Sequence, residues 1–422
     1  MKARPLKDTV HLNTSDFAPN LAQRHRVGRF WLFVFQGSTL VGIVVLSMLL
    51  LNILNSTFGY VAVENKIDPD TLAVNGVPLE DLPQEELLRL LQENVSAGLY
   101  RGLESQQPFA ERSRQDVYNL VLERVVEPHV VKSWSLQDSL FRRAQIAAEV
   151  ADAYPEADLQ FRSWLNAQFM RQPQSAKAQS AGVRTAILGS LWTVGIAIVF
   201  AFPIGVGGAI YLEEYAADNA FNRVIRTNIN NLAGVPSIIY GMLGLAIFVR
   251  ALEPLTSGAL LGYADSTTAN GRTILSAGLT LGLLILPLII INAQEAIRAV
   301  PSSLRQASFG IGATRWQTVW YHVLPYAMPG ILTGTILAIS RAMGETAPLV
   351  VIGASTFINV DPNGPFAKFT TLPTQIYQWT SRPQDVFRNI AAAAIIVLVM
   401  LVLSLNATAV ILRRRFSRRL DS

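Results

Sequence analysis

The sequence contains no cysteine, which excludes disulfides, thiolate catalysis, cysteine-ligated zinc and iron–sulfur clusters. It has only four histidines, scattered at His11, His25, His129 and His322, and none lies in an H-E-x-x-H arrangement, so no metal site is expected. Charged residues make up 15% of the chain, against roughly 25% in an average soluble domain. Half of the residues, 50%, are hydrophobic. This composition is not that of an ordinary cytosolic protein.

The phosphate-binding loop of many ATPases is also missing, because no lysine in the chain follows a glycine. Two glycine-rich stretches, Gly205-Val-Gly-Gly and Gly310-Ile-Gly, lie in an apolar run and a loop, without the strand, turn and helix of a dinucleotide site. Close helix packing explains the first stretch better. We therefore expect that this chain does not bind ATP through such a loop, and no bound cofactor is expected.

Long apolar runs dominate what is present. A helix needs about 20 apolar residues to cross the hydrocarbon layer of a membrane. Six runs meet or approach that length: Phe30–Leu54, Val183–Leu212, Ile229–Val249, Ile274–Asn292, Tyr326–Ile352 and Ile390–Leu412. The predicted fold class is an all-α membrane protein with six transmembrane helices, the first at 30–54 and the other five in a core at 181–412.

Lysine and arginine in the short flanks of these runs predict the orientation, because such residues are enriched on the cytoplasmic side. With the N-terminus inside, the inner segments carry 16 of these residues and the short outer segments carry 5. Both termini are therefore expected in the cytoplasm, as a basic arm at 1–29 and a basic tail at 413–422.

The segment at 55–180 differs in composition, with 18 acidic against 12 basic residues. Helical spacing recurs after Asp81 and over Arg112–Glu127, Ser135–Tyr154 and Ala157–Met170, with breaks near Pro108, Pro128 and Pro155. We expect a small, mostly helical extracytoplasmic domain, inserted between the first two spans, with residues 172–180 as a linker back to the membrane.

The inner loop at 294–325 has the pattern of a helical hairpin. Ser302 or Ser303 can cap a short helix through Phe309, and Gly310 and Gly312 allow a sharp turn. A second helix can start at Thr314 and end before Pro325. The spacing alone leaves two interpretations open: a docking element for a partner, or a surface connector without one.

The residues of this hairpin resemble the coupling motif of ABC importer permeases, Glu-Ala-Ala followed by Gly and a later Leu-Pro. The matching residues are Gln306, Ala307, Ser308, Gly312, Ala313, Leu324 and Pro325. The resemblance implies that this loop sits in a groove of a separate ATPase subunit and transmits its closure. Gln306 departs from the usual Glu and removes a charge at that contact.

Further stretches resemble the PstA-type permeases of phosphate-specific ABC importers, which have a MetI-like core. They are Asn231–Gly241, Arg341–Leu349, Leu372–Trp379 and Ala209–Tyr215. The resemblance implies a phosphate-import permease subunit in the bacterial inner membrane. The implied partners are a PstC-like second permease, a PstB-like ATPase dimer and a periplasmic PstS-like phosphate-binding protein. No nucleic-acid partner is expected, and the resemblance assigns no role to the 55–180 domain.

Arg341 and Glu345 stand four residues apart within an apolar run, where a charge costs about 2.5 kcal/mol or more. They can pair on one helical face. Together with the adjacent Thr346 they are candidates for the substrate path, since a partly neutralised cation suits phosphate. A structural ion pair between helices is the alternative.

Five prolines lie within or at the ends of these runs, namely Pro203, Pro236, Pro287, Pro329 and Pro348. They are either kinks for alternating access or the ordinary proline content of spanning helices. Two other functions are weighed against the importer: a membrane-anchored sensor or signalling subunit, and an ion-coupled secondary transporter. The first would need a cytoplasmic catalytic or phosphoacceptor domain, which the sequence lacks. The second is disfavoured by the coupling-type loop.

Overall fold

The computed structural model describes residues 21–74, 76–106, 108–262, 270–354, 357–358 and 360–421. Most of the expected basic arm, residues 1–20, lies outside this part. Two compact units are distinguished, Met1–Asn52 and Ile53–Ser422. The first unit is occupied by most of helix α1 (Leu21–Thr57), whose apolar surface is exposed within the chain and long enough to cross a membrane.

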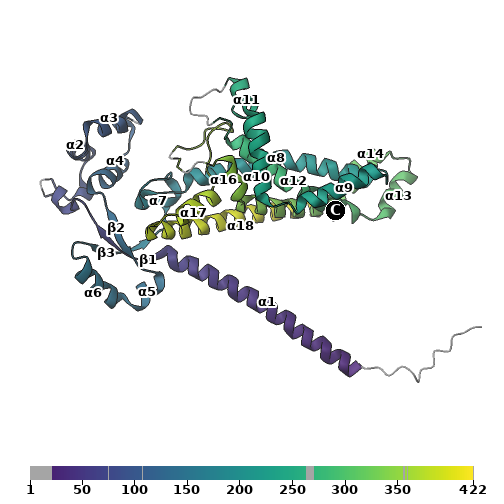
Figure 1. Cartoon of the computed structure of the whole chain (residues 1–422), viewed down its shortest axis with the longest axis horizontal. Coiled ribbons are helices and arrows are strands. Elements are labelled where there is room, and N and C mark those ends of the chain that lie inside the picture. The colour runs from purple at the N-terminus through teal and green to yellow at the C-terminus, as the bar shows by residue number, and fades with distance from the viewer. Residues whose placement is uncertain are drawn as a thin grey trace, which may run out of the picture. The chain divides into compact units, whose positions relative to one another are not determined.

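The second unit contains a helical core at 184–421 and a domain at 58–180 (Figure 1). We call the latter the outer domain, after the side of the membrane on which the sequence predicts it. The helices of the core are α8 (Arg184–Ile210), α9 (Ala220–Ala233), α10 (Ser237–Gly244), α11 (Glu253–Thr256), α12 (Ile274–Arg298), α13 (Ser302–Gly310), α14 (Arg315–Thr318), α15 (Leu324–Gly344), α16 (Ala347–Ile352), α17 (Leu372–Thr380) and α18 (Asp385–Asp421). Across the described residues, five helices are long and apolar enough to span a membrane, or six if the bent pair α9 and α10 counts as one span. The expectation of six spans therefore holds if that bent pair counts as one span.

Helix α12 is the centre of the core and packs against both α8 and α15. Small residues permit this close packing: a Cβ added to Gly205 in α8 would lie 2.7 Å from Ile289 in α12, and one added to Gly278 would lie 2.6 Å from Ile196. The sequence interpretation of Gly205 as a packing residue is confirmed. Because lipid is as apolar as these side chains, close van der Waals contact stabilises such a helix pair.

Two of the predicted continuous spans are broken. The run at Ile229–Val249 bends by 105° between α9 and α10, where Gly234, Val235 and Pro236 interrupt the helix. The run at Tyr326–Ile352 ends α15 at Gly344 and restarts at α16, with Glu345 extended. Pro236 explains the first break, because proline disfavours a helical residue before it. At the second break, Pro348 lies in the first turn of α16 and lacks the N–H that would continue the helical hydrogen bonding from Gly344.

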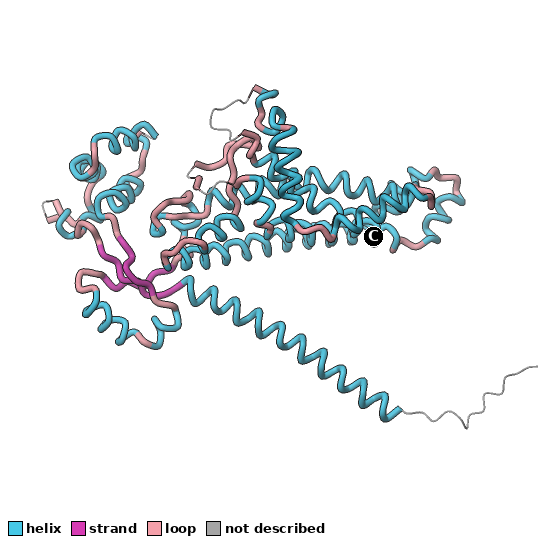
Figure 2. Tube along the Cα trace, in the orientation of Figure 1, coloured by secondary structure: helices cyan, strands magenta, loops and turns pink. Residues whose placement is uncertain are grey.

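The outer domain is mostly helical, as expected, with α2 (Gln84–Asn94), α3 (Ala97–Gln106), α4 (Arg114–Val121), α5 (Leu136–Phe141), α6 (Arg143–Ala153) and α7 (Ala167–Arg171). It also contains an antiparallel sheet in the order β2-β1-β3, formed by β1 (Phe58–Glu64), β2 (His129–Ser133) and β3 (Asp158–Ser163) (Figure 2). The helix expected over Ala157–Met170 is therefore wrong in its first half. β1 pairs along its length with β3, from Phe58 opposite Ser163 to Val63 opposite Asp158.

The outer domain shares an apolar cluster with the helical core. Val61, Val130 and Trp164 of the outer domain belong to the same buried cluster as Trp379 of α17 and Ile390 of α18. The expected linker is also packed, because Ala178 is buried in this cluster and the Gly182 N–H donates to the Pro173 carbonyl at 2.8 Å. Shared burial joins the domain to the core.

Candidate functional site: a clamped hairpin and a broken helix

The hairpin forms over α13 and α14, with its turn at Gly312 (Figure 1). Gly312 has φ +86°, a conformation that side-chain-bearing residues rarely adopt, although no atom lies within 4 Å of an added Cβ. The Ala313 N–H donates to the Ser308 carbonyl at 3.2 Å and closes the turn. Thr314 then starts α14 with a capping box to Gln317. The turn and the second helix start confirm the sequence prediction.

Two details of that prediction are wrong. Pro301, and neither Ser302 nor Ser303, occupies the position before α13, because the fixed φ of proline suits the extended residue at a helix start. The second helix does not end before Pro325 either, since a π-helical turn, η9 (Val319–Val323), joins α14 to α15. Pro325 sits in the first turn of α15, where its missing N–H costs little.

The hairpin residues with a family match divide into two groups. Ser308 is buried, and its hydroxyl lies 2.9 Å from that of Thr318, so it joins the two helices to each other. Gln306 and Ala307 are exposed, while Ala313, Leu324 and Pro325 are half-buried. Ser308 therefore shapes the hairpin, and Gln306 and Ala307 are available to a partner.

The tip of the hairpin presents apolar surface. Ile311 is 84% exposed and Phe309 is 46% exposed, and the exposed rings of Trp316 and Trp320 stack with their centroids 5.4 Å apart. Exposed bulky apolar side chains gathered on one hairpin are typical of an interaction site. The geometry therefore favours a docking element over a connector.

A glutamate at the end of the first core span anchors the hairpin. Arg305 of α13 donates to Glu214 at 2.7 Å, from Nη2 to Oε1, and also donates to the carbonyls of Val300 and Ile297. The Glu214 side chain is only 11% exposed. Several acceptors hold a partly buried arginine in one position. Arg305 therefore ties the hairpin to η6 (Tyr211–Tyr215), the π-helical turn that contains Glu214.

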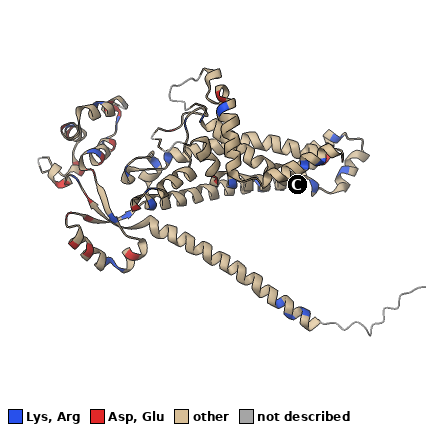
Figure 3. Ribbon diagram, in the orientation of Figure 1, with Lys and Arg blue, Asp and Glu red and all other residues tan. Residues whose placement is uncertain are grey.

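The neighbouring glutamate joins two further helices. Glu213 accepts from Arg226 of α9 at 3.1 Å and from Arg298 of α12 at 2.8 Å. Sequence reasoning quoted the stretch Ala209–Tyr215 but assigned no role to either glutamate. A signal for their role was available in the sequence. Two adjacent acidic residues end an apolar run, and each of the remaining segments predicted to be cytoplasmic carries arginines that could pair with them. We call Glu213, Glu214, Arg226, Arg298 and Arg305 the glutamate clamp; its charges lie at the hairpin end of the core (Figure 3).

The second candidate region is the break between α15 and α16. Arg341 Nε lies 3.4 Å from Glu345 Oε1, so the predicted pair forms, with the two side chains 43% and 17% exposed. Glu345 lies beyond the end of α15 and is extended, with φ −75° and ψ 126°. Thr346 follows as the half-buried residue before α16, without a capping hydrogen bond from its side chain. The three candidate residues therefore lie together in a helix break.

Tertiary packing brings a second family stretch to this break. A Cβ added to Gly241 in α10 would lie 2.7 Å from the Cα of Pro348 in α16, so the two helices touch backbone to backbone. The buried Tyr240 beside it donates from its hydroxyl to the Leu232 carbonyl at 2.7 Å and braces the α9–α10 bend. The stretches at 231–241 and 341–349 thus form one structural region built from two broken helices.

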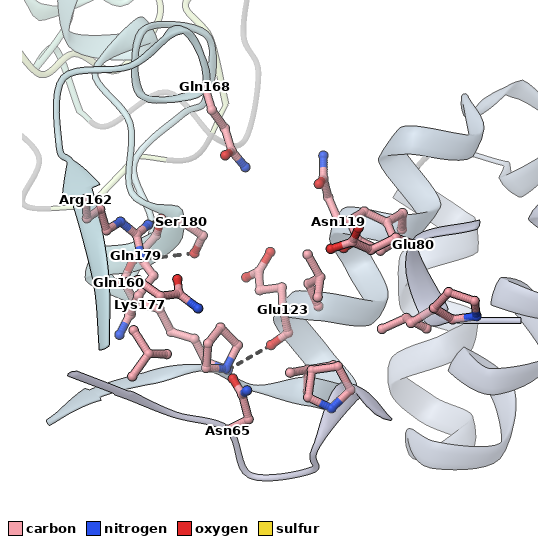
Figure 4. A pocket seen from close by; sticks show the side chains of 18 of the residues that line it. Asn65, Glu80, Asn119, Glu123, Gln160, Arg162, Gln168, Lys177, Gln179 and Ser180 are labelled. Atoms are coloured by element: carbon pink, nitrogen blue, oxygen red, sulfur yellow. Dashed lines mark hydrogen bonds between the residues drawn. The ribbon is translucent and has the colours of Figure 1, made fainter. Parts of the chain in front are cut away.

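The outer domain contains a cavity of about 440 Å³ with charges on opposite walls (Figure 4). Arg162, Gln179 and Ser180 lie along one wall, and Glu80 and Glu123 along the other. Burial lowers the pKa of the Arg162 guanidinium, which stacks 4.6 Å from the Trp164 ring and donates to the Gln179 carbonyl at 3.0 Å. The cavity has polar walls and mixed charge, and no sequence prediction concerned it.

A metal site was not expected. Among the residues that the structure describes, no three of the His, Asp and Glu side chains gather in a group able to hold an ion.

Comparisons with known proteins identify the family of this chain. The model of the family described as "Binding-protein-dependent transport system inner membrane component" matches residues 201–422. The phosphate transport system permease protein PstA 1 of Mycobacterium tuberculosis is 37% identical over 242 residues, which cover 57% of this chain and 73% of that protein. The PstA protein of Haemophilus influenzae is 30% identical over 243 residues, covering 57% of this chain and 79% of that protein.

A solved bacterial alginate ABC transporter, in complex with an alginate-bound periplasmic protein, aligns with 66% of this chain and 95% of its own. The TM-score is 0.42 and the sequence identity 16%, a likeness too distant to carry an argument. The family match and the relatives are sufficient by themselves. The chain belongs to the family of binding-protein-dependent transport system inner membrane components, and is thus a non-enzymatic permease of an ABC transporter, in which a separate subunit is the ATPase.

Proposed function

We propose that this chain is the PstA-type permease subunit of an ATP-driven phosphate importer. The names of the relatives supply the substrate, since both proteins compared above are phosphate transport system permeases. The observation that carries the coupling to an ATPase is the hairpin, with a glycine turn, an internal Ser308–Thr318 hydrogen bond and an exposed apolar tip. Such a tip suits a groove in a partner protein.

The likeness to phosphate transport system permeases also supports a set of partner subunits. A PstC-like second permease completes the path, a PstB-like ATPase dimer receives the hairpin, and a PstS-like binding protein delivers phosphate from outside. The protein is a multi-pass inner-membrane component. The excess of lysine and arginine on the inner segments supports a cytoplasmic location for both termini and for the hairpin.

The hairpin residues have distinct tasks in this proposal. Gln306 and Ala307 contact the ATPase, while Ser308, Gly312 and Ala313 keep the hairpin in shape. Leu324 and Pro325 stand where the hairpin enters α15, so movement of the ATPase reaches the span that carries Arg341 in its last turn. The glutamate clamp carries the same movement to α9 and α12. ATP hydrolysis in the partner shifts the population between two arrangements of the core.

The break at Arg341, Glu345 and Thr346 is the proposed phosphate path. Arg341 uses Nε for the glutamate, and its exposed guanidinium has further N–H donors for a phosphate oxygen. One carboxylate beside it stabilises the cation without enclosing it. A charge on a spanning segment is expensive in lipid, so the exposed side of Arg341 is expected to face a water-filled path or the second permease.

The two rival functions predict different behaviour. A secondary transporter would continue uptake after ATP depletion and stop when the ion gradient collapses. A sensor subunit would bind its ligand without moving phosphate across the membrane. The exposed, clamped hairpin favours the ATP-driven importer over both, because neither rival needs a docking site for an ATPase.

The deciding experiment is purification of the complex followed by an ATPase assay in proteoliposomes. We expect an ATPase to co-purify with this chain and its hydrolysis to rise at least several-fold when phosphate-loaded binding protein is added. Unloaded binding protein is the control. Hydrolysis that does not respond to phosphate, or uptake that survives ATP depletion, would contradict the proposal.

A further inference from the structure

The α5–α6 junction of the outer domain carries apolar and basic side chains that point away from the domain. Leu140 is 66% exposed and Phe141 is 82% exposed, the second among the most exposed large apolar residues of the described chain. Arg142 and Arg143 follow directly and are exposed. Segments that lie in a membrane interface typically combine bulky apolar residues with arginine or lysine, and this junction has the same combination.

The inner side of α5 is fixed against the sheet. The Ser139 hydroxyl accepts from the Tyr60 N–H of β1 at 2.8 Å, and Ser139 is 4% exposed. Ser135 caps α5 and its carbonyl accepts from the Ser139 hydroxyl. Because α5 is held on this side, Leu140 and Phe141 cannot turn inward, and their exposure is a fixed property of the fold.

Two contacts place this segment at the membrane boundary. The apolar run of the first span ends at Leu54, and the next residue, Asn55, accepts from the Gln137 N–H of α5 at 2.7 Å. On the other side, Ser133 at the end of β2 accepts from Asn389, in the second turn of the spanning helix α18, at 2.9 Å. Residues 133–137 are thereby tied to the ends of two membrane spans that are far apart in the sequence.

The two arginines are available to lipid phosphates. Arg142 is bound to Asp138 only through an exposed pair, at 3.5 Å with the arginine side chain 67% exposed, and such pairs are weak. The Arg143 guanidinium lies 5.8 Å from the Tyr60 ring, a contact that leaves its edge free for hydrogen bonds. Arginine forms forked hydrogen bonds with phosphate, and a lipid surface presents many such groups.

We propose that Leu140 and Phe141 insert into the membrane surface from which the first span emerges, with Arg142 and Arg143 on the lipid phosphates. The occupant of this face is lipid, because both neighbouring contacts lead to spanning helices and the exposed charge complements phosphate. The outer domain is already attached to the membrane by the first span, which ends at Leu54, and by helix α18, which begins at Asp385. Insertion of Leu140 and Phe141 is a third attachment, and it holds the sheet at a fixed distance from the membrane. The proposal needs only a membrane-embedded chain and is independent of the transported substrate.

The absence of cysteine makes a direct test possible. Phe141→Cys gives this chain a single thiol for an environment-sensitive nitrobenzoxadiazole label, within the assembled complex in proteoliposomes of phosphatidylethanolamine and phosphatidylglycerol. The complex with the unsubstituted chain, labelled in the same way, gives the signal to subtract for partner thiols. The matched control is Leu99→Cys, an exposed apolar residue of α3 in the same domain. Nitroxide-labelled lipid is expected to quench the label at 141 at least twofold more than at 99, and aqueous iodide is expected to show the reverse order.

Three results would overturn the proposal. Equal quenching of both sites by iodide would place Phe141 in water, and protection of the label from both quenchers would mean that a protein covers it. Unchanged lipid quenching after Arg142→Gln with Arg143→Gln would remove the arginines from the anchor. Leu140→Cys repeats the measurement at a neighbouring position and guards against a local effect of the label at 141.

Discussion

The ion pairs at the hairpin end and the ion pair at the α15–α16 break use the same residue types in opposite ways. At the hairpin end, Glu213 and Glu214 are each 11% exposed and together engage three arginines from three helices. At the break, Arg341 is 43% exposed and has a single carboxylate neighbour at 3.4 Å. The first set joins three helices to two largely buried carboxylates, although Arg298 itself is 64% exposed, and the second is a single pair.

This difference indicates separate tasks for the two regions: transmitting movement of the hairpin at one end, and binding phosphate at the helix break. Glu213 and Glu214 are largely buried and accept from arginines of three other helices, which restricts the relative positions of those helices. A single exposed pair stabilises little by itself, and it can exchange partners with an incoming anion. We infer that the glutamate clamp moves as one body with the hairpin, whereas Arg341 is free to respond to phosphate. Four experiments test this comparison.

The first experiment tests the side of the membrane on which the 55–180 domain and the 294–325 loop lie. Its outcome is cleavage or no cleavage. Protease added to intact spheroplasts is expected to cut within 55–180 and to leave the 294–325 loop intact. The loop should be cut only after the membrane is opened, because the basic inner flanks hold it in the cytoplasm. Cleavage of this loop in sealed spheroplasts would reverse the orientation.

The second experiment disrupts the hairpin turn with Gly312→Val. A β-branched residue at φ +86° is strained by about 1–3 kcal/mol, so the turn should open and phosphate uptake should fall at least tenfold while membrane insertion continues. Gly310→Ala is the matched control, since no positive φ and no atom within 4 Å opposes it. Normal ATP-driven uptake by Gly312→Val would show that the hairpin does not couple.

The third experiment removes the single pair with Arg341→Leu and Glu345→Leu together. If Arg341 meets phosphate, the double variant should assemble and hydrolyse ATP but lose most phosphate uptake, because the donors for the anion are gone. Arg341→Lys should be intermediate, since it keeps the charge and loses the planar fork.

The alternative, a purely structural pair, makes the opposite prediction for the double variant. Removing both charges would then be tolerated better than removing one, because an unpaired charge is costlier than an apolar pair. Near-normal uptake in vesicles with confirmed complex assembly would therefore discard the pathway role.

The fourth experiment loosens the clamp with Glu214→Gln, and its effect is the smallest. Arg305 keeps its two carbonyl acceptors, so we expect a loss of about 2 kcal/mol in hairpin anchoring and a several-fold fall in phosphate-stimulated ATP hydrolysis. Glu156→Gln, at an exposed glutamate of the outer domain, is the control. Equal activity of the two variants would mean that the clamp does not transmit movement.

Sequence reasoning succeeded where the signal is local. The turn at Gly312 and the start of α14 at Thr314 depend on residues within a few positions of each other. It failed at β1, because the pairing partners of Phe58–Glu64 lie about 70 and 100 residues later in the chain. It also treated the run at Ile229–Val249 as one helix, since hydropathy alone does not report a bend.

The sequence by itself determined the membrane-spanning character, the hairpin with its glycine turn and the four-residue spacing of Arg341 and Glu345. These features depend on local periodicity, glycine freedom and composition, which require no knowledge of distant contacts. Only the tertiary structure decided which arginines Glu213 and Glu214 bind, how Gly241 meets Pro348, and how Asn55 and Asn389 fix the outer domain. Those contacts join segments dozens to hundreds of residues apart, and chain folding selects them by packing and charge satisfaction summed over the whole core.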